Sequence, residues 1–377
     1  MCRLPSACDF SETRPFQAQE YTIIQKSATP SVPQAEPIKK KKLRPAWIST
    51  VAPYQVPDRF KAWVQVINSF VPYLALWGLM VWTTQIHWAL TLLLAFPAMG
   101  FLMRIFIIQH DCGHGSFFKN NRLNSVVGTI AGILTLTPYH LWRKSHAIHH
   151  AGSSNLNKRG TGDINTLTVQ EYLSLSRWQR LKYRLYRSRF VLFVVGSPFM
   201  FAILQRFPPK RHMTPNERKS LIGTNLALAG IAGLGIWLLG WKTFLLVQVP
   251  ITFLAANTGT WMFYVQHQYD DTYWAWRDDW DYYTAAIKGS SYYKLPRVLQ
   301  WFSGNIGFHH IHHLSALIPN YHLPRAFKEN PEFHKVTTLT IRSSLHTAKL
   351  ALWDEQKQKM VDFDYVNALL RRQTAGA

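Results

Sequence analysis

Four long apolar blocks, arranged in two close pairs, constrain the fold of this chain more than any other feature. The first pair covers residues 66–82 and 88–108, and the second covers residues 221–239 and 242–265. A helix of about 20 apolar residues is about 30 Å long, which matches the hydrocarbon thickness of a bilayer. The sequence therefore predicts an all-α, polytopic membrane protein with four transmembrane helices in two hairpins.

The distribution of positive charge predicts how these hairpins are oriented. Lys and Arg total 42 against 20 Asp and Glu, and the basic residues gather at residues 39–44, 177–189 and 206–219. The two hairpin turns, at residues 83–87 and 240–242, hold one lysine between them. Because Lys and Arg are enriched on the cytoplasmic side of membranes, we expect both turns outside and a helical cap in the cytoplasm. A nucleic-acid partner is disfavoured, because the basic residues gather in the segments predicted to lie in the cytoplasm.

The remaining segments suggest three parts. Residues 1–45 are polar and contain four consecutive lysines at 39–42, which indicates a flexible cytoplasmic tail. Residues 46–335 form the membrane domain with its cap, and residues 336–377 form a C-terminal cytoplasmic segment. Two shorter apolar stretches, 126–137 and 190–204, are expected to lie in the interface or to dip into the membrane and return. Three cysteines exclude a disulfide framework.

Three tight clusters contain nine of the sixteen histidines. The first cluster, HDCGH, places His110 and His114 four residues apart at the end of the second apolar block. The second, HAIHH, contains His146, His149 and His150, and the third, HHIHH, contains His309, His310, His312 and His313. Residues three and four apart share one face of a helix, so the imidazoles of each cluster can reach a common metal ion.

The number of these histidines points to two metal ions, because eight imidazoles exceed what one ion can bind. Imidazole suits zinc, copper, iron or nickel, so the ligand type leaves the metal open. A redox metal that acts on an apolar substrate fits a membrane protein better than a hydrolytic zinc. Metal binding requires neutral imidazole, so activity should fall at acidic pH.

These boxes read HxxxH, HxxHH and HxxHH, and the chain resembles the integral-membrane fatty acid desaturases. Further matching segments, at residues 263–268, 289–296, 305–308 and 318–321, are similar to those of bacterial acyl-lipid desaturases. The resemblance covers residues 60–335. It implies a multi-pass protein of the bacterial inner membrane that introduces a cis double bond into a lipid acyl chain, with O2 as co-substrate.

The resemblance also implies a non-haem di-iron centre on the cytoplasmic face. The implied iron ligands are His110, His114, His146, His149, His150, His267, His309, His312 and His313. His267 occupies the position of the ninth ligand, whereas Phe263 replaces an Asn of the animal acyl-CoA enzymes. The HxxHH register favours His309, although spacing alone allows His310 instead. Asp111 is expected either to orient a ligand or to be a helix-terminal carboxylate.

Substrate and electron-donor contacts follow from the same resemblance. Aromatic residues near the boxes are candidates to line an acyl tunnel or simply to pack, namely Trp142, Trp261, Tyr264 and Trp301. Arg143, Lys144 and Lys158 are candidates for head-group or donor contacts, or ordinary positive-inside charge. The sequence contains no haem-binding segment and no dinucleotide fingerprint. We therefore expect electrons from a ferredoxin or flavodoxin, alternatively cytochrome b5, with its reductase.

Two other functions compete with this interpretation. A di-iron hydroxylase acting on an alkane, a carotenoid or an acyl chain would use the same ligands but return oxygen to the substrate. A membrane metal transporter or sensor would also contain histidine clusters. Transporters place their ligands near the bilayer midplane, whereas these histidines lie at the ends of the apolar blocks. The transporter is therefore the weaker alternative.

Overall fold

The spans predicted from the apolar blocks are present as four long helices. The computed structural model describes residues 45–208 and 213–375. Within them, four helices are long and apolar enough to cross a membrane: α2 (Arg59–Thr83), α3 (Trp88–His114), α9 (Pro215–Leu239) and α10 (Trp241–His267). The prediction of a helical membrane protein with two hairpins is confirmed. The predicted tail and its lysine cluster lie outside the described residues, apart from Pro45.

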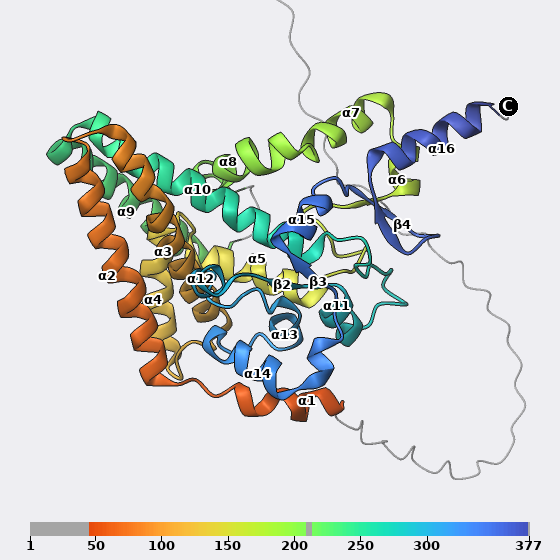
Figure 1. Cartoon of the computed structure of the whole chain (residues 1–377), viewed down its shortest axis with the longest axis horizontal. Coiled ribbons are helices and arrows are strands. Elements are labelled where there is room, and N and C mark those ends of the chain that lie inside the picture. The colour runs from red at the N-terminus through yellow and green to blue at the C-terminus, as the bar shows by residue number, and fades with distance from the viewer. Residues whose placement is uncertain (1–44, 209–212, 376–377) are drawn as a thin grey trace, which may run out of the picture. The chain divides into compact units, whose positions relative to one another are not determined.

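α3 is the central helix of the membrane bundle (Figure 1). It packs against α2, α10 and α4 (Asn121–Leu134), and α9 lies against α10 and α5 (Tyr139–Gly152). More than half of the apolar window of α3 is buried, 56%, whereas only 6% of the α9 window is buried. Large apolar side chains on α9, such as Leu226 and Trp237, are exposed, as expected for helices that face lipid.

The local sequence explains where the spans end. Asp58 caps α2 by accepting a hydrogen bond from the backbone N–H of Lys61, and Gly115 ends α3 with a φ of 73°, in the left-handed region. Gly240 forms the whole turn between α9 and α10 with a φ of 77°. The two hairpin turns lie at one end of the bundle, and the histidine-bearing ends of α3 and α10 lie at the other (Figure 1).

The two shorter apolar stretches form short helices. Residues 126–137 belong mainly to α4, which has 14 residues and is too short to span. Residues 190–204 follow α7 (Arg177–Tyr186) and form the π-helical turn η2 (Val191–Gly196), α8 (Ser197–Ala202) and the start of η3 (Leu204–Arg206). The chain bends by 57° between α7 and the following segment Val191–Arg206. This bend is compatible with a broken span or with a re-entrant segment. The expected interfacial location stays a prediction.

The remaining elements form the cap. Its helices are α1 (Ala46–Val51), α5, α6 (Val169–Ser174), α11 (Tyr282–Lys288), α12 (Arg297–Phe302), α13 (His309–Leu314), α14 (Leu323–Glu329), α15 (Ile341–Thr347) and α16 (Phe363–Ala375). Short 3-10 turns lie among them: η1 (Ala52–Tyr54), η4 (Asn320–His322) and η5 (Pro331–His334). A buried cluster that includes Val51, Ile311 and Phe333 joins α1, α13 and the α14 region.

Two small sheets in the cap are additional to the predicted helices. β2 (Tyr292–Lys294) pairs in parallel with β3 (Thr338–Thr340), with Tyr293 opposite Leu339. β4 (Leu352–Asp354) lies between β1 (Leu167–Thr168), which is parallel to it, and β5 (Lys359–Val361), which is antiparallel. These pairings join residues after 335 to the cap. The predicted domain boundary at 335 stays a prediction.

Candidate metal centre

Four helices bring the predicted histidines to one place. α3 contributes His110 and His114 from its last turn, and α10 ends at His267. α5 carries the second histidine box, and α13 carries the third. All nine predicted ligands lie in two adjoining groups, although the boxes are far apart in sequence.

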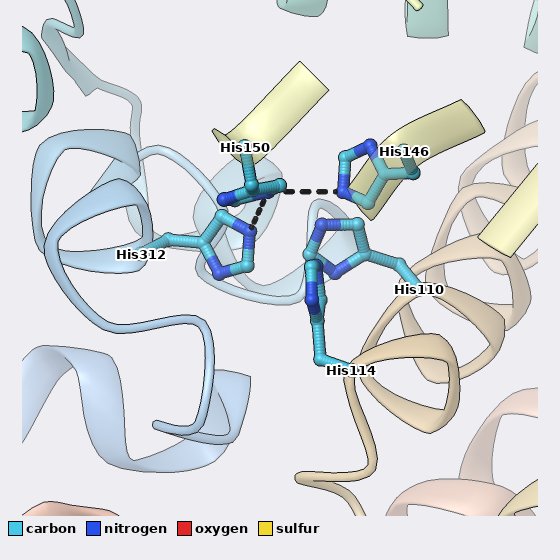
Figure 2. A group of neighbouring side chains, drawn as sticks. All are labelled: His110, His114, His146, His150 and His312. Atoms are coloured by element: carbon cyan, nitrogen blue, oxygen red, sulfur yellow. Dashed lines mark hydrogen bonds between the residues drawn. The ribbon is translucent and has the colours of Figure 1, made fainter. Parts of the chain in front are cut away.

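The first group has five members: His110, His114, His146, His150 and His312 (Figure 2). Each offers one ring nitrogen, and these five atoms all lie within 4.8 Å of one another. The Nε2 atoms of His146 and His150 are 3.1 Å apart, and so are those of His150 and His312. Five imidazoles that converge at this distance form a plausible site for one metal ion.

The second group has four members: His149, His267, His309 and His313. The ring nitrogens of His149, His267 and His313 lie within 4.8 Å of one another. His309 joins them, because its Nε2 lies 2.9 Å from that of His267 and 3.1 Å from that of His313. All four residues are buried.

The two groups touch each other through α5 and α13. The rings of His150 and His313 stack with centroids 4.2 Å apart, although they belong to different groups. His149 faces the second group, whereas its neighbours on α5 face the first. The second and third boxes therefore each contribute histidines to both groups. Two separate but adjacent ions fit this arrangement.

His310 lies outside both groups. Its Nε2 lies 3.1 Å from the backbone carbonyl of Phe333 and donates to it. Burial lowers the pKa of His310 to about 3, so this ring is neutral. Of the two alternatives that spacing left open, the structure brings His309 into the histidine cluster and directs His310 away from it.

The hydrogen bonds of two rings indicate which of their nitrogens carries the lone pair. The Nδ1–H of His267 donates to the carbonyl of Gly289, 3.0 Å away, and the Nδ1–H of His110 donates to the Asp111 carboxylate, 2.9 Å away. A neutral imidazole protonated at Nδ1 has its lone pair on Nε2, the atom that a metal binds. The buried Nε2 of His114 has no hydrogen-bond partner among the described residues.

The protonation of the other predicted ligands also suits a metal. Burial lowers the pKa of the α5 histidines His146, His149 and His150 well below the usual range. The same cause lowers the pKa of the α13 histidines His309, His312 and His313. These rings are therefore neutral near pH 7, as metal ligation requires. The residues fit two metal ions bound by imidazole.

Asp111 has the orienting contact that was one of its two expected roles. One carboxylate oxygen accepts from His110, and the other accepts from the backbone N–H of Asn320 at 2.6 Å and from its side-chain amide at 2.8 Å. Asp111 and Asn320 are both buried. Sequence reasoning did not identify Asn320, whose only signal was its place in the matching segment 318–321.

The candidate tunnel aromatics have different positions. Trp142 stacks on His146 with ring centroids 4.5 Å apart. Phe263, the departure from the animal pattern, packs 5.1 Å from both His149 and His267. Tyr264 donates to the Leu350 carbonyl. Three of the four candidates therefore pack elsewhere than on the histidines. Trp261 packs on Phe193 with ring centroids 5.1 Å apart, Tyr264 bonds to Leu350, and Trp301 lies 3.7 Å from the Arg104 guanidinium.

The candidate basic residues are mostly engaged within the protein. Lys144 forms an ion pair with Glu217 at 2.9 Å, and Lys158 lies 5.7 Å from the ring of Trp280. The stem of Arg143 packs near Gly113. Their contact with a head group or an electron donor stays a prediction.

Comparison with known sequences decides the family. The sequence profile of the family described as "Fatty acid desaturase" matches residues 86–343. The chain belongs to the fatty acid desaturase family. It is also 46% identical to a fatty acid desaturase of Bacillus subtilis over 313 residues, which is 83% of this chain and 89% of the relative.

More distant relatives have more specific names. An sn-1 acyl-lipid omega-3 desaturase (ferredoxin) of Synechocystis is 28% identical over 59% of this chain and 62% of its own length. An sn-1 oleoyl-lipid 12-desaturase of Anabaena variabilis is 28% identical over 73% of this chain and 77% of its own length. The desaturase is thus an oxidoreductase with membrane-type helices and a histidine cluster able to bind metal, and the hydroxylase alternative is not favoured.

Proposed function

We propose that the chain is an acyl-lipid desaturase that uses two iron ions, O2 and two external electrons to introduce a cis double bond into a lipid acyl chain. The convergence of nine imidazoles in two adjoining groups supports this proposal most strongly. The names of the cyanobacterial relatives support an acyl chain esterified to a lipid as substrate.

The histidines would divide between the two ions by group. His110, His114, His146, His150 and His312 would hold the first ion, and His149, His267, His309 and His313 would hold the second. Bound iron would supply the activation of O2 that removal of hydrogen from an unactivated methylene requires. All of these ligands would be imidazoles, so no carboxylate would bind either ion directly, and Asp111 would act only through His110.

The surrounding residues would hold these ligands in place and exclude water. Asp111 fixes the tautomer and orientation of His110, and the Gly289 carbonyl does the same for His267. Trp142 and Phe263 cover the rings with apolar surface. A dry and rigid site would limit side reactions of the oxidant.

The electron donor would be a ferredoxin or flavodoxin, alternatively cytochrome b5, with its reductase. The word "ferredoxin" in the name of the Synechocystis relative supports the first of these. The positive-inside bias supports a site on the cytoplasmic face of a bacterial inner membrane, because the histidine-bearing ends of α3 and α10 lie opposite the charge-poor turns.

The decisive experiment is a fatty-acid profile by gas chromatography and mass spectrometry. Membranes of a bacterial host that expresses the chain with a ferredoxin system are compared with membranes that contain the His149→Ala variant. The proposal expects a new chain that has lost two hydrogens and is absent from the control. A product that has gained one oxygen instead, or an unchanged profile from iron-loaded protein with a competent donor, would contradict it.

A further inference from the structure

An open apolar groove lies beside the candidate metal centre, on a different face of α10. It has a volume of about 550 Å³, within the roughly 300–1,000 Å³ typical of small-molecule sites. It is lined by Phe193 and Val194 of η2, by Trp261 of α10, and by Leu345 and Ala348 at α15. Figure 1 shows α8, which follows η2, running alongside α10.

The surface around the groove is apolar and exposed. Phe190, at its entrance, is 65% exposed, and Leu345 is 63% exposed. The exposed apolar surface continues along the bent segment through Val195 and Phe199. This segment also meets the length and composition of a broken span or re-entrant loop. With this segment in the membrane as predicted, the groove would open toward the hydrocarbon phase, and its occupant is expected to come from there.

A free cation lies at the entrance of the groove. Arg189 lines it, is exposed and has no hydrogen bond or ion pair among the residues the structure describes. Arg187, two residues earlier, is buried instead, and its guanidinium donates to Gln268 at 2.8 Å and to the Leu350 carbonyl at 2.9 Å. Of these two arginines, only Arg189 is available to a ligand.

An apolar groove with a cation at its entrance complements a lipid whose chain carries a phosphate at one end. A guanidinium binds phosphate oxygens well, and positive charges near a membrane attract anionic lipids. Acyl chains carried on a soluble carrier would arrive from the aqueous side instead. Trp261 lies six residues before His267, about 9 Å along the helix axis, so α10 links the groove to the candidate metal centre.

We propose that this groove is the lateral binding site for a membrane glycerophospholipid, with one acyl chain on Trp261 and the phosphate on Arg189. The proposal rests on the proposed function, because it identifies where that lipid substrate enters. It assigns Ala348 and Arg189 to substrate binding, away from the histidine cluster.

The test is photocrosslinking of the full-length, iron-loaded protein in phosphatidylglycerol nanodiscs. The probe is phosphatidylglycerol with a diazirine on one acyl chain, and labelled peptides are located by mass spectrometry. Label is expected on residues 190–194, on Trp261 and on residues 345–348. Label that falls only on the lipid-facing sides of α2 and α9 would overturn the proposal.

Two variants with matched controls sharpen the test. Ala348→Trp fills the groove and should reduce its labelling at least fivefold, whereas Ala229→Trp adds the same bulk at an exposed alanine of α9 and should not. Arg189→Gln should reduce groove labelling about fivefold, the effect of removing one positive charge near an anionic lipid. Arg177→Gln, on the exposed start of α7, should leave it unchanged. The proposal would be overturned if each variant and its control changed groove labelling equally. Arg189→Gln and Arg177→Gln provide the answer even if Ala348→Trp fails to fold.

Measuring unsaturated product on the same preparations separates the two proposals. If the wild-type protein forms product but the groove takes no label, the groove proposal fails and the function stands. If the groove takes label but no product forms with a competent electron donor, the function fails and the lipid site stands. With both correct, Ala348→Trp lowers product formation while the iron content per chain is unchanged.

Discussion

Replacing Asp111 with asparagine should weaken metal binding far more than it weakens the fold. The carboxylate accepts from the His110 ring on one side and from two Asn320 donors on the other. An amide has only one acceptor oxygen. If that oxygen stays toward Asn320, the new NH2 group faces His110 Nδ1, which must then lose its proton to Nε2. The metal-facing nitrogen would become a donor and could no longer ligate.

The magnitude follows from which orientation the amide takes. Turning its NH2 toward Asn320 would leave two buried donors unpaired, at about 1–3 kcal/mol each. The orientation that disturbs His110 is therefore favoured. Changing an outer partner of a ligating histidine typically costs about 10–100-fold in metal affinity, or about 1.4–2.7 kcal/mol. We expect Asp111→Asn to lose metal affinity within this range.

The assay is a competitive chelator titration of the purified protein in detergent, with thermal unfolding measured in parallel. Asp354→Asn is the matched control, because Asp354 is also buried and accepts two backbone N–H groups, from Gln356 and Lys357, but lies outside the histidine cluster. Metal affinity within twofold of wild type in Asp111→Asn would refute the tautomer argument. An equal loss in Asp354→Asn would refute it too.

Three further outcomes follow from the same contacts. His309→Ala should lower metal content from two ions to one per chain, whereas His310→Asn should retain both, as metal analysis of the purified variants would show. The metal-free protein should lose thermal stability as pH falls below about 6.5. Burial lowers the pKa of histidines in the second and third boxes, such as His146 and His312, so in that range only the unfolded chain gains protons on them. A melting temperature unchanged between pH 7.5 and 5.5 would contradict this. Arg104→Met should destabilise the protein by about 1–3 kcal/mol without metal loss, because Arg104 donates to the Trp301 carbonyl and to Ser69; chemical unfolding measures the difference.

Much of the fold and of the histidine cluster could be predicted from sequence, because both depend on local periodicity. A 20-residue apolar block can satisfy its backbone in a membrane only as a helix. The i, i+3, i+4 spacing of each box fixes which imidazoles share a helical face. The nine histidines that were predicted as ligands are the nine that the structure gathers.

The features that sequence did not reveal depend on contacts between distant segments. Asn320 reaches Asp111 across 209 residues, and no local pattern indicates this pair. β2 and β3 are three residues each and are defined only by their pairing. The groove combines η2, α10 and α15. His310 stays outside both histidine groups because its Nε2 donates to the Phe333 carbonyl. The spacing within the box does not predict this contact.

α5 and α13 each contribute histidines to both groups, so these two helices would fix the distance between two bound ions. Residues three or four apart on a helix have Cβ atoms about 5–6 Å apart, so each helix bridges the groups with a fixed separation. α13 is short, but Tyr282 donates to the carbonyls of His313 and Leu314, and the buried cluster around Ile311 holds it from behind. Because two rigid helices rather than loops bridge the groups, loss of one ligand should empty one site and leave the other in place.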